Sequence, residues 1–478
     1  MKKQIFIFAT ALFILILAVS AWIGIQKIKN LGETEEPAAN AELVDSGNPV
    51  AEVKIAEVAK EKTIPRNKNF DERLTAGENF FASGNFENAE GEFIAAAALE
   101  PGEITPLLRL ATTQIKIGKF DPARGNLDAA EKLDAVHPEI FLLRGQIFLA
   151  KKNFADAEKE FGKAGADGKF WQGAMRAFYD KTKEAKKLFE QSSDPRAGKF
   201  LTVFAEYEQF PDSPKTHLDT LLAYAFIEIG QYQLAIAKLK PVLADDANYR
   251  DAWLLFGYAE FAIEEFDLAR QSWQTAFSLD PTHPESQYFL GLANFELENF
   301  AEAEKYFLLA RANKFEAIEL EQKLIETYLA EGKYRAAADL LAAKLESDPD
   351  TAIDDFTRPI SLYLEKIGDG GTAWSLASIG LERFPDEPLA YNLAGWVSLS
   401  NNYLVEAYNQ LKIAISLDEN LAWPYFNFGK YFEKMGDRDA ALGAYGKAFE
   451  IDPEGEVGVF AAQNYNRLLE EINPTSNE

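Results

Sequence analysis

The chain has 478 residues, of which 47% are hydrophobic and 26% charged, a globular composition that excludes a wholly disordered chain. It contains no cysteine and only three histidines, which excludes disulfides, thiolate metal sites and a His-rich metal cluster. The net charge of −27 argues against nucleic acid as a partner, because an acidic surface repels phosphate.

The first 29 residues predict a single membrane-spanning helix. Residues 5–25 carry no charged side chain, and a helix of that length spans about 31 Å, close to the thickness of bilayer hydrocarbon. Lys2 and Lys3 precede this stretch and Trp22 lies near its far end, so the positive-inside rule places the N-terminus in the cytoplasm. We therefore expect a single-pass membrane protein whose body is extracytoplasmic, either periplasmic or at the cell surface.

A cleaved secretory signal is the competing interpretation of the same segment. Residues 19–21 (Val-Ser-Ala) have the small or aliphatic character that a signal peptidase requires. The apolar stretch continues through Ile25 and exceeds the usual length of a signal core, which favours an uncleaved anchor. Residues 30–69 contain three prolines and no long apolar periodicity, so we expect a disordered linker that tethers the body to the membrane.

Residues 70–453 repeat one pattern about every 34 residues. In the repeat that begins at residue 250, positions 4, 7, 8, 17, 20, 24, 27 and 32 are Trp253, Phe256, Gly257, Phe266, Ala269, Trp273, Ala276 and Pro281. Similar residues recur from 284 and from 422, for example Gly291 with Phe307 and Gly429 with Tyr445. Residues three and four apart share a helix face, so positions 4, 7, 8 and 11 pack from a first helix against positions 20, 24 and 27 of a second. Trp273 is expected to be buried there.

This pattern resembles the tetratricopeptide repeat, a helix–turn–helix unit of 34 residues. Repeats begin near residues 70, 104, 138, 216, 250, 284, 318, 354, 388 and 422, and a degenerate copy lies around residues 171–192, which makes about eleven. Glycine falls at position 15 in several repeats, where the first helix ends and a left-handed residue is favoured. The resemblance implies an all-α solenoid that winds into a right-handed superhelix with the first helices on its concave side.

Two segments depart from the regular repeat. The stretch 172–215 is ten residues longer than one repeat and contains Pro195, Pro211 and Pro214, so we expect an irregularity there, with a hinge between two arms as one form of it. Residues 454–478 follow the last repeat, and their segment 456–472 predicts a capping helix that buries apolar residues such as Val457 and Leu468.

A second stripe on the first helices supplies the candidate binding site. In the resembling family, positions 5, 9 and 12 point into the concave groove, and here they are rich in aromatic and aliphatic side chains, which predicts a surface for apolar anchors of a peptide. Nearby acids favour partners whose anchors are flanked by basic residues. The alternative is that the superhelix buries these rings against its own wall. The candidate peptide-groove residues are Tyr224, Ile227, Tyr258, Phe261, Tyr288, Leu292, Phe295, Trp396 and Phe426.

No catalytic, metal-binding or cofactor-binding motif stands out from the sequence. The glycines at 368, 370 and 371 lie in a predicted inter-helix turn, without the lysine of a phosphate-binding loop. Asn392 and Lys430 alone do not complete the carboxylate-binding set that some members of the family carry. We therefore expect a non-enzymatic, membrane-anchored scaffold that binds proteins or peptides in its groove. The alternative is a cleaved, soluble periplasmic or secreted repeat protein that acts as a carrier or assembly factor.

Overall fold

The computed structural model describes residues 68–210, 212–348 and 350–472, so the predicted membrane span and nearly all of the predicted linker lie outside the described residues. Within the described residues the chain is helical and contains no β-strand. No helix among them combines the length and the apolar character needed to cross a bilayer. The chain divides into two compact parts, which we call the N-terminal body (described residues up to 280) and the C-terminal body (described residues from 281).

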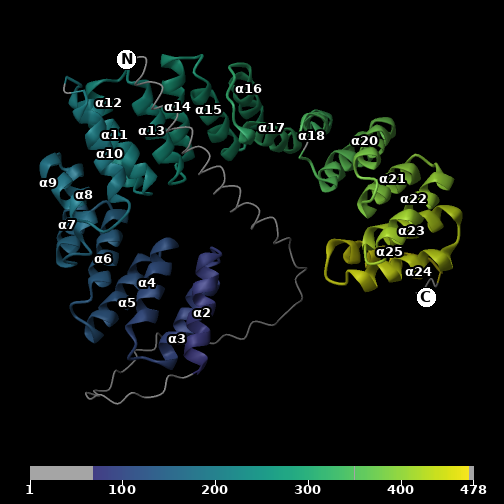
Figure 1. Cartoon of the computed structure of the whole chain (residues 1–478), viewed down its shortest axis with the longest axis horizontal. Helices are drawn as coiled ribbons and strands as arrows, with labels where there is room; N and C mark the ends of the chain where they lie inside the picture. The colour runs from purple at the N-terminus through teal and green to yellow at the C-terminus, as the bar shows by residue number, and fades with distance from the viewer. Residues whose placement is uncertain (1–67, 211, 349, 473–478) are drawn as a thin grey trace, which may run out of the picture. The chain divides into compact units, whose positions relative to one another are not determined.

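The N-terminal body consists of six helix pairs and one additional helix, α10, within the described residues. Its helices are α2 (Lys68–Ala82), α3 (Phe86–Leu99), α4 (Ile104–Lys116), α5 (Phe120–Leu133), α6 (Pro138–Ala150), α7 (Phe154–Lys163), α8 (Lys169–Phe178), α9 (Thr182–Glu190), α10 (Ala197–Glu208), α11 (Lys215–Glu228), α12 (Tyr232–Asp245), α13 (Arg250–Phe261) and α14 (Phe266–Leu279). Each pair is an antiparallel hairpin that packs against the next, as Figure 1 shows.

The C-terminal body consists of five pairs and a terminal helix within its described residues. Its helices are α15 (Pro284–Glu296), α16 (Phe300–Ala312), α17 (Ile318–Ala330), α18 (Tyr334–Ser347), the 3₁₀-helix η1 (Ile353–Phe356), α19 (Thr357–Ser361), the π-helix η2 (Leu362–Ile367), α20 (Gly370–Arg383), α21 (Pro388–Ser400), α22 (Leu404–Leu417), α23 (Ala422–Met435), α24 (Arg438–Ile451) and α25 (Glu456–Ile472). The all-helical solenoid of stacked hairpins that the sequence predicts is therefore confirmed.

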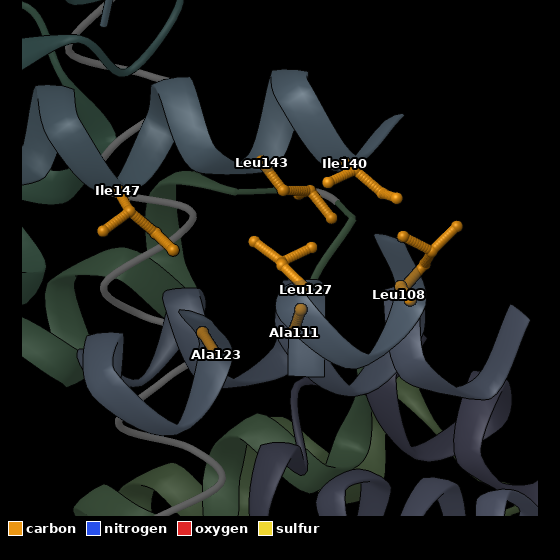
Figure 2. Packing of buried hydrophobic residues seen from close by; sticks show 8 residues of the cluster. Leu108, Ala111, Ala123, Leu127, Ile140, Leu143 and Ile147 are labelled. Atoms are coloured by element: carbon orange, nitrogen blue, oxygen red, sulfur yellow. The ribbon is translucent and has the colours of Figure 1, made fainter. Parts of the chain in front are cut away.

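Neighbouring hairpins share a continuous apolar core. Around α4, α5 and α6, Leu127 of α5 points towards Ile140 and Leu143 of the following hairpin, while Leu108 of α4 completes the cluster (Figure 2). No single hairpin could bury these side chains alone, so each repeat depends on its neighbours for stability.

Close approach of the two helices within a hairpin requires a small residue at position 8. Trp273 of α14 is fully buried, as its sequence position predicts, and its indole Nε1 donates a hydrogen bond to the Leu254 carbonyl at 3.0 Å. A β-carbon at Gly257 would lie 2.6 Å from that same nitrogen, closer than van der Waals contact permits. Glycine at this position therefore makes room for the tryptophan ring.

The turn inside each hairpin places one residue in the left-handed region. Gly436 adopts φ of 78° where α23 ends, and glycine accepts this conformation without steric cost. Repeats that lack glycine keep the same turn, for example at Glu264 with φ of 64° and Glu298 with φ of 59°. The turn geometry is thus imposed by the hairpin even where the residue disfavours it.

The irregularity predicted at 172–215 contains α10, an additional helix between α9 and α11. Phe200 of α10 stacks on Phe189 of α9 with ring centroids 4.7 Å apart and lies 5.2 Å from the Phe226 ring of α11. The core therefore continues through this stretch, and the boundary between the two bodies lies at residue 280 instead. These contacts do not support the hinge suggested for this stretch.

A buried ionic network also joins the helices on either side of α10. Lys238 of α12 is 5% exposed, and its ammonium lies 2.8 Å from the Asp219 carboxylate of α11. The same ammonium donates to the Phe178 carbonyl at the end of α8 and to the Asp180 carboxylate in the following turn. Burial raises the pKa of Asp180, but hydrogen bonds from Lys238 and Lys215 outweigh it and hold the pKa below its ordinary value.

Candidate functional site

The predicted groove residues of the N-terminal body are mostly buried. Ile227, Tyr258 and Phe261 are all less than 9% exposed, whereas Tyr224 on α11 is partly exposed. Phe261 packs against Phe266 and Trp273 of its own hairpin, with ring centroids 5.0 and 5.4 Å apart. The expectation that the side chains of Ile227, Tyr258 and Phe261 are accessible is therefore wrong.

Tyr224 remains the accessible member of this set in the N-terminal body. Partial burial raises the pKa of its phenol, and the nearby Glu228 carboxylate raises it further by its charge and by accepting a hydrogen bond. Glu228 also pairs with Lys199 of α10 at 2.9 Å. The phenol therefore stays protonated at physiological pH and lies beside a charge pair that bridges α10 and α11.

Two predicted groove rings of the C-terminal body are also buried. Tyr288 is 1% exposed and stacks on Phe315 with ring centroids 4.5 Å apart. Phe315 lies in the loop between α16 and α17, outside the repeating pattern. Phe426 of α23 is buried against Tyr445 of α24 at 5.7 Å, and the Lys430 ammonium lies 4.7 Å from its ring centre. The expected accessibility is wrong for Tyr288 and Phe426 as well.

Leu292, Phe295 and Trp396 keep part of their surface exposed to solvent. Leu292 and Phe295 lie one turn apart on α15, and Trp396 lies on α21, a first helix of a later repeat. The Lys323 ammonium of α17 lies 4.5 Å from the Phe295 ring centre and pairs with the Glu326 carboxylate at 2.7 Å. The accessible part of the predicted stripe in this body is thus apolar and edged by a charge pair.

Asn392, the candidate for binding a partner's carboxylate, has a structural role instead. It is buried on α21, and its side-chain carbonyl accepts a hydrogen bond from the Asn427 amide of α23 at 3.0 Å. This bond links the first helices of two successive repeats and satisfies two polar groups inside the core.

A cavity of about 560 Å³ lies at the contact of α17, α18 and α19. Ile325 and Leu341 contribute to its apolar wall, and Lys344 and Arg358 also line it. The sequence did contain a signal for this site, because Ile325 occupies position 8 and Lys344 position 27, where most repeats carry glycine or alanine.

No cluster of three or more His, Asp or Glu side chains is arranged to hold a metal ion in the part of the chain that the structure describes. His283 instead caps α15, where its Nδ1 accepts a hydrogen bond from the Ser286 amide at 3.4 Å. His217 lies half-buried on α11, and burial lowers the pKa of its imidazole below the ordinary value.

The architecture of stacked hairpins defines an all-helical repeat protein. Family models described as tetratricopeptide repeat match residues 108–174 and 254–317, and a further tetratricopeptide repeat model matches residues 424–454. Segments of both bodies thus match the tetratricopeptide repeat. No curated protein matches the chain.

Several solved structures share a low similarity with the chain. The C-terminal part of a TPR repeat-containing protein from Cytophaga hutchinsonii is 15% identical, covers 61% of this chain and 98% of its own, and has a TM-score of 0.36. Yeast Tom70 is 14% identical, with 86% and 97% covered and a TM-score of 0.29. YrrB, described as a TPR protein with an unusual peptide-binding site, is 16% identical, with 47% and 97% covered and a TM-score of 0.25.

Proposed function

We propose that the protein is a non-enzymatic scaffold that binds partner proteins or peptides through the first helices of its repeats. Tetratricopeptide repeats are typical of protein–protein interaction, and the matched segments support this general role. The observation that carries the proposal is the accessibility of Leu292, Phe295 and Trp396 on first helices of the C-terminal body, whereas Tyr288 and Phe426 of the same body are buried. Apolar side chains on such a face serve as anchors for a partner's own apolar residues.

The negative charge of the chain favours a partner that carries basic residues. The chain carries a net charge of −27, and its field attracts basic segments over long range. A partner with basic residues on either side of its apolar anchors therefore associates faster than a neutral one, and this advantage falls as salt is added.

We also propose that residues 5–25 anchor the protein in a membrane, with the N-terminus in the cytoplasm and the body outside it. The length and apolar character of this segment, with Lys2 and Lys3 before it, support the proposal. In the second candidate, cleavage near Ala21 releases a soluble carrier. Membrane fractionation after a high-salt wash distinguishes the two, because the anchored form sediments with membranes and the cleaved form does not.

Site-specific photo-crosslinking in the full chain tests the proposed binding face. A photoreactive residue at position 396 or 295 is expected to give adducts with a partner protein, identifiable by mass spectrometry. Trp374 supplies the matched control, because it is a 51% exposed tryptophan of the same body on α20, a second helix. Equal adduct formation from position 374, or none from 295 and 396, would contradict the proposal.

A further inference from the structure

The cavity between α17, α18 and α19 arises where one repeat departs from the pattern of the others. In regular repeats, position 8 is small so that the position-24 side chain can reach it, as Gly291 and Phe307 illustrate: a β-carbon on that glycine would lie 2.4 Å from the ring. Here position 8 is Ile325 and position 24 is Leu341, which is only half-buried. The bulky residue at position 8 prevents the usual close approach of the two helices, and space remains between them.

A solvent-exposed cation lines this cavity at the position where other repeats place a small core residue. Position 27 is alanine in most repeats, and those alanines are buried: Ala96, Ala130, Ala164, Ala276, Ala310, Ala414 and Ala448. In this repeat the position is Lys344, which lines the cavity. Arg358 of α19 lines it too, from the first helix of the next repeat. Two solvent-exposed positive side chains thus line a space whose walls include Ile318, Leu340 and Leu341.

Two acidic and two basic residues line the cavity, but the acids are paired with cations outside it. Its acidic residues have cationic partners, because Glu326 pairs with Lys323 at 2.7 Å and Glu321 pairs with Arg311 at 3.5 Å. Neither of those cations lines the cavity. Within the described residues, Lys344 and Arg358 form no ion pair. In a chain with a net charge of −27, two cations without an ion-pair partner beside one partly apolar cavity favour an anion there.

We propose that this cavity binds an amphiphilic carboxylate, an apolar chain of about 8–12 carbons with one carboxylate head. The Arg358 guanidinium and the Lys344 ammonium hold the head, since a guanidinium matches the two oxygens of a carboxylate and an ammonium adds a further charge-assisted hydrogen bond. The chain lies against Ile325 and Leu341. A volume of about 560 Å³ is within the usual range of small-molecule sites.

Calorimetric titration of the full-length protein with dodecanoate, below its micelle concentration, tests this proposal. We expect one dodecanoate per chain, at least about tenfold weaker binding of dodecanol, and no measurable binding of acetate at the same concentrations, because both the head and the chain contribute. Absence of dodecanoate binding, or equal binding of the alcohol, would overturn the proposal.

Four single-residue variants test whether dodecanoate binds in this cavity. Lys344→Ala installs the residue that other repeats carry, so folding is retained, and we expect it to weaken dodecanoate binding about tenfold; Arg358→Gln is expected to act similarly. Lys344→Arg is expected to retain binding. Lys412→Ala, which removes an exposed lysine from α22 of the same body, is the matched control and should leave binding unchanged. Equal losses in the Lys344→Ala and Lys412→Ala variants would contradict the assignment. The proposal is independent of the binding face at Leu292, Phe295 and Trp396, so either can fail alone.

Discussion

Replacing Gly257 by alanine tests how closely the two helices of one hairpin must approach. The added β-carbon would lie 2.6 Å from Nε1 and 2.7 Å from Cδ1 of the Trp273 ring, so the ring or the helix must move. Overpacking of this kind costs about 1–3 kcal/mol, and movement of the ring also weakens the Nε1 hydrogen bond to the Leu254 carbonyl, worth about 1 kcal/mol. Alanine's higher helix propensity offsets about 1 kcal/mol of this loss.

We therefore expect Gly257→Ala to lower the local stability of α13 and α14 by about 1–3 kcal/mol, measured by hydrogen exchange of their amides. Gly125→Ala is the matched control, because Gly125 lies in the middle of α5 with no atom within 4 Å of the β-carbon that alanine would add. There alanine should stabilise the helix by about 0.5–1 kcal/mol. If Gly257→Ala also increases protection, the close approach does not constrain the hairpin and our reasoning is wrong.

Three further predictions concern single residues. Glu298→Gly should stabilise α15 and α16 by up to about 1 kcal/mol, because glycine adopts the φ of 59° without strain; lower protection of their amides would contradict this. Trp273→Ala should cost about 3–5 kcal/mol around α13 and α14 and leave α2 to α5 protected, whereas uniform loss of protection would contradict nearest-neighbour coupling. Burial raises the pKa of Glu260 despite the hydroxyl hydrogen bond from Ser272, so the folded protein holds this proton more tightly than the unfolded chain. Local stability should therefore fall as pH rises from 4.5 through the raised pKa, and Glu260→Gln should reduce this dependence; an unchanged pH profile would contradict it.

The hairpins could be predicted because their determinants are local and recur. Trp273 and its counterpart Tyr445 occupy the same position of the repeat, and both are fully buried against a glycine of the preceding helix. Gly436 and the other glycines at position 15 adopt the left-handed conformation that a helix end requires. Each of these features depends on residues within one hairpin, so a single sequence is sufficient to reveal it.

Accessibility of the stripe could not be predicted in the same way. Tyr288 is covered by Phe315, which lies in a loop outside the repeating positions, and Phe261 is covered by Trp273 from the second helix. The repeat pattern of the sequence predicts which face of its helix each side chain occupies. It does not show which residues from loops and neighbouring helices cover that face. The candidate site therefore retains only the partly exposed residues of the predicted set, which are Tyr224, Leu292, Phe295 and Trp396.

The contacts of helix α10 and the cavity are two further features that were not predicted from the sequence. Extra length at 172–215 was visible in the sequence, but the contacts of Phe200 with Phe226 and of Lys238 with Phe178, which make this stretch part of the core, join different helix pairs. Ile325 and Lys344 did break the repeat at positions 8 and 27. A comparison of every repeat at each packing position would have revealed them before the structure.

The central claim, that first helices of the repeats provide the binding face, is tested most directly by a matched pair of tryptophan substitutions in the full chain. The affinity for the partner identified by crosslinking is measured for Trp396→Ala and for Trp374→Ala, which lie on a first and a second helix of the same body. We predict that Trp396→Ala weakens binding about tenfold or more, as loss of an interface anchor does, and that Trp374→Ala leaves it unchanged. Unchanged binding by Trp396→Ala together with a loss in Trp374→Ala would place the partner on the second helices and contradict the claim.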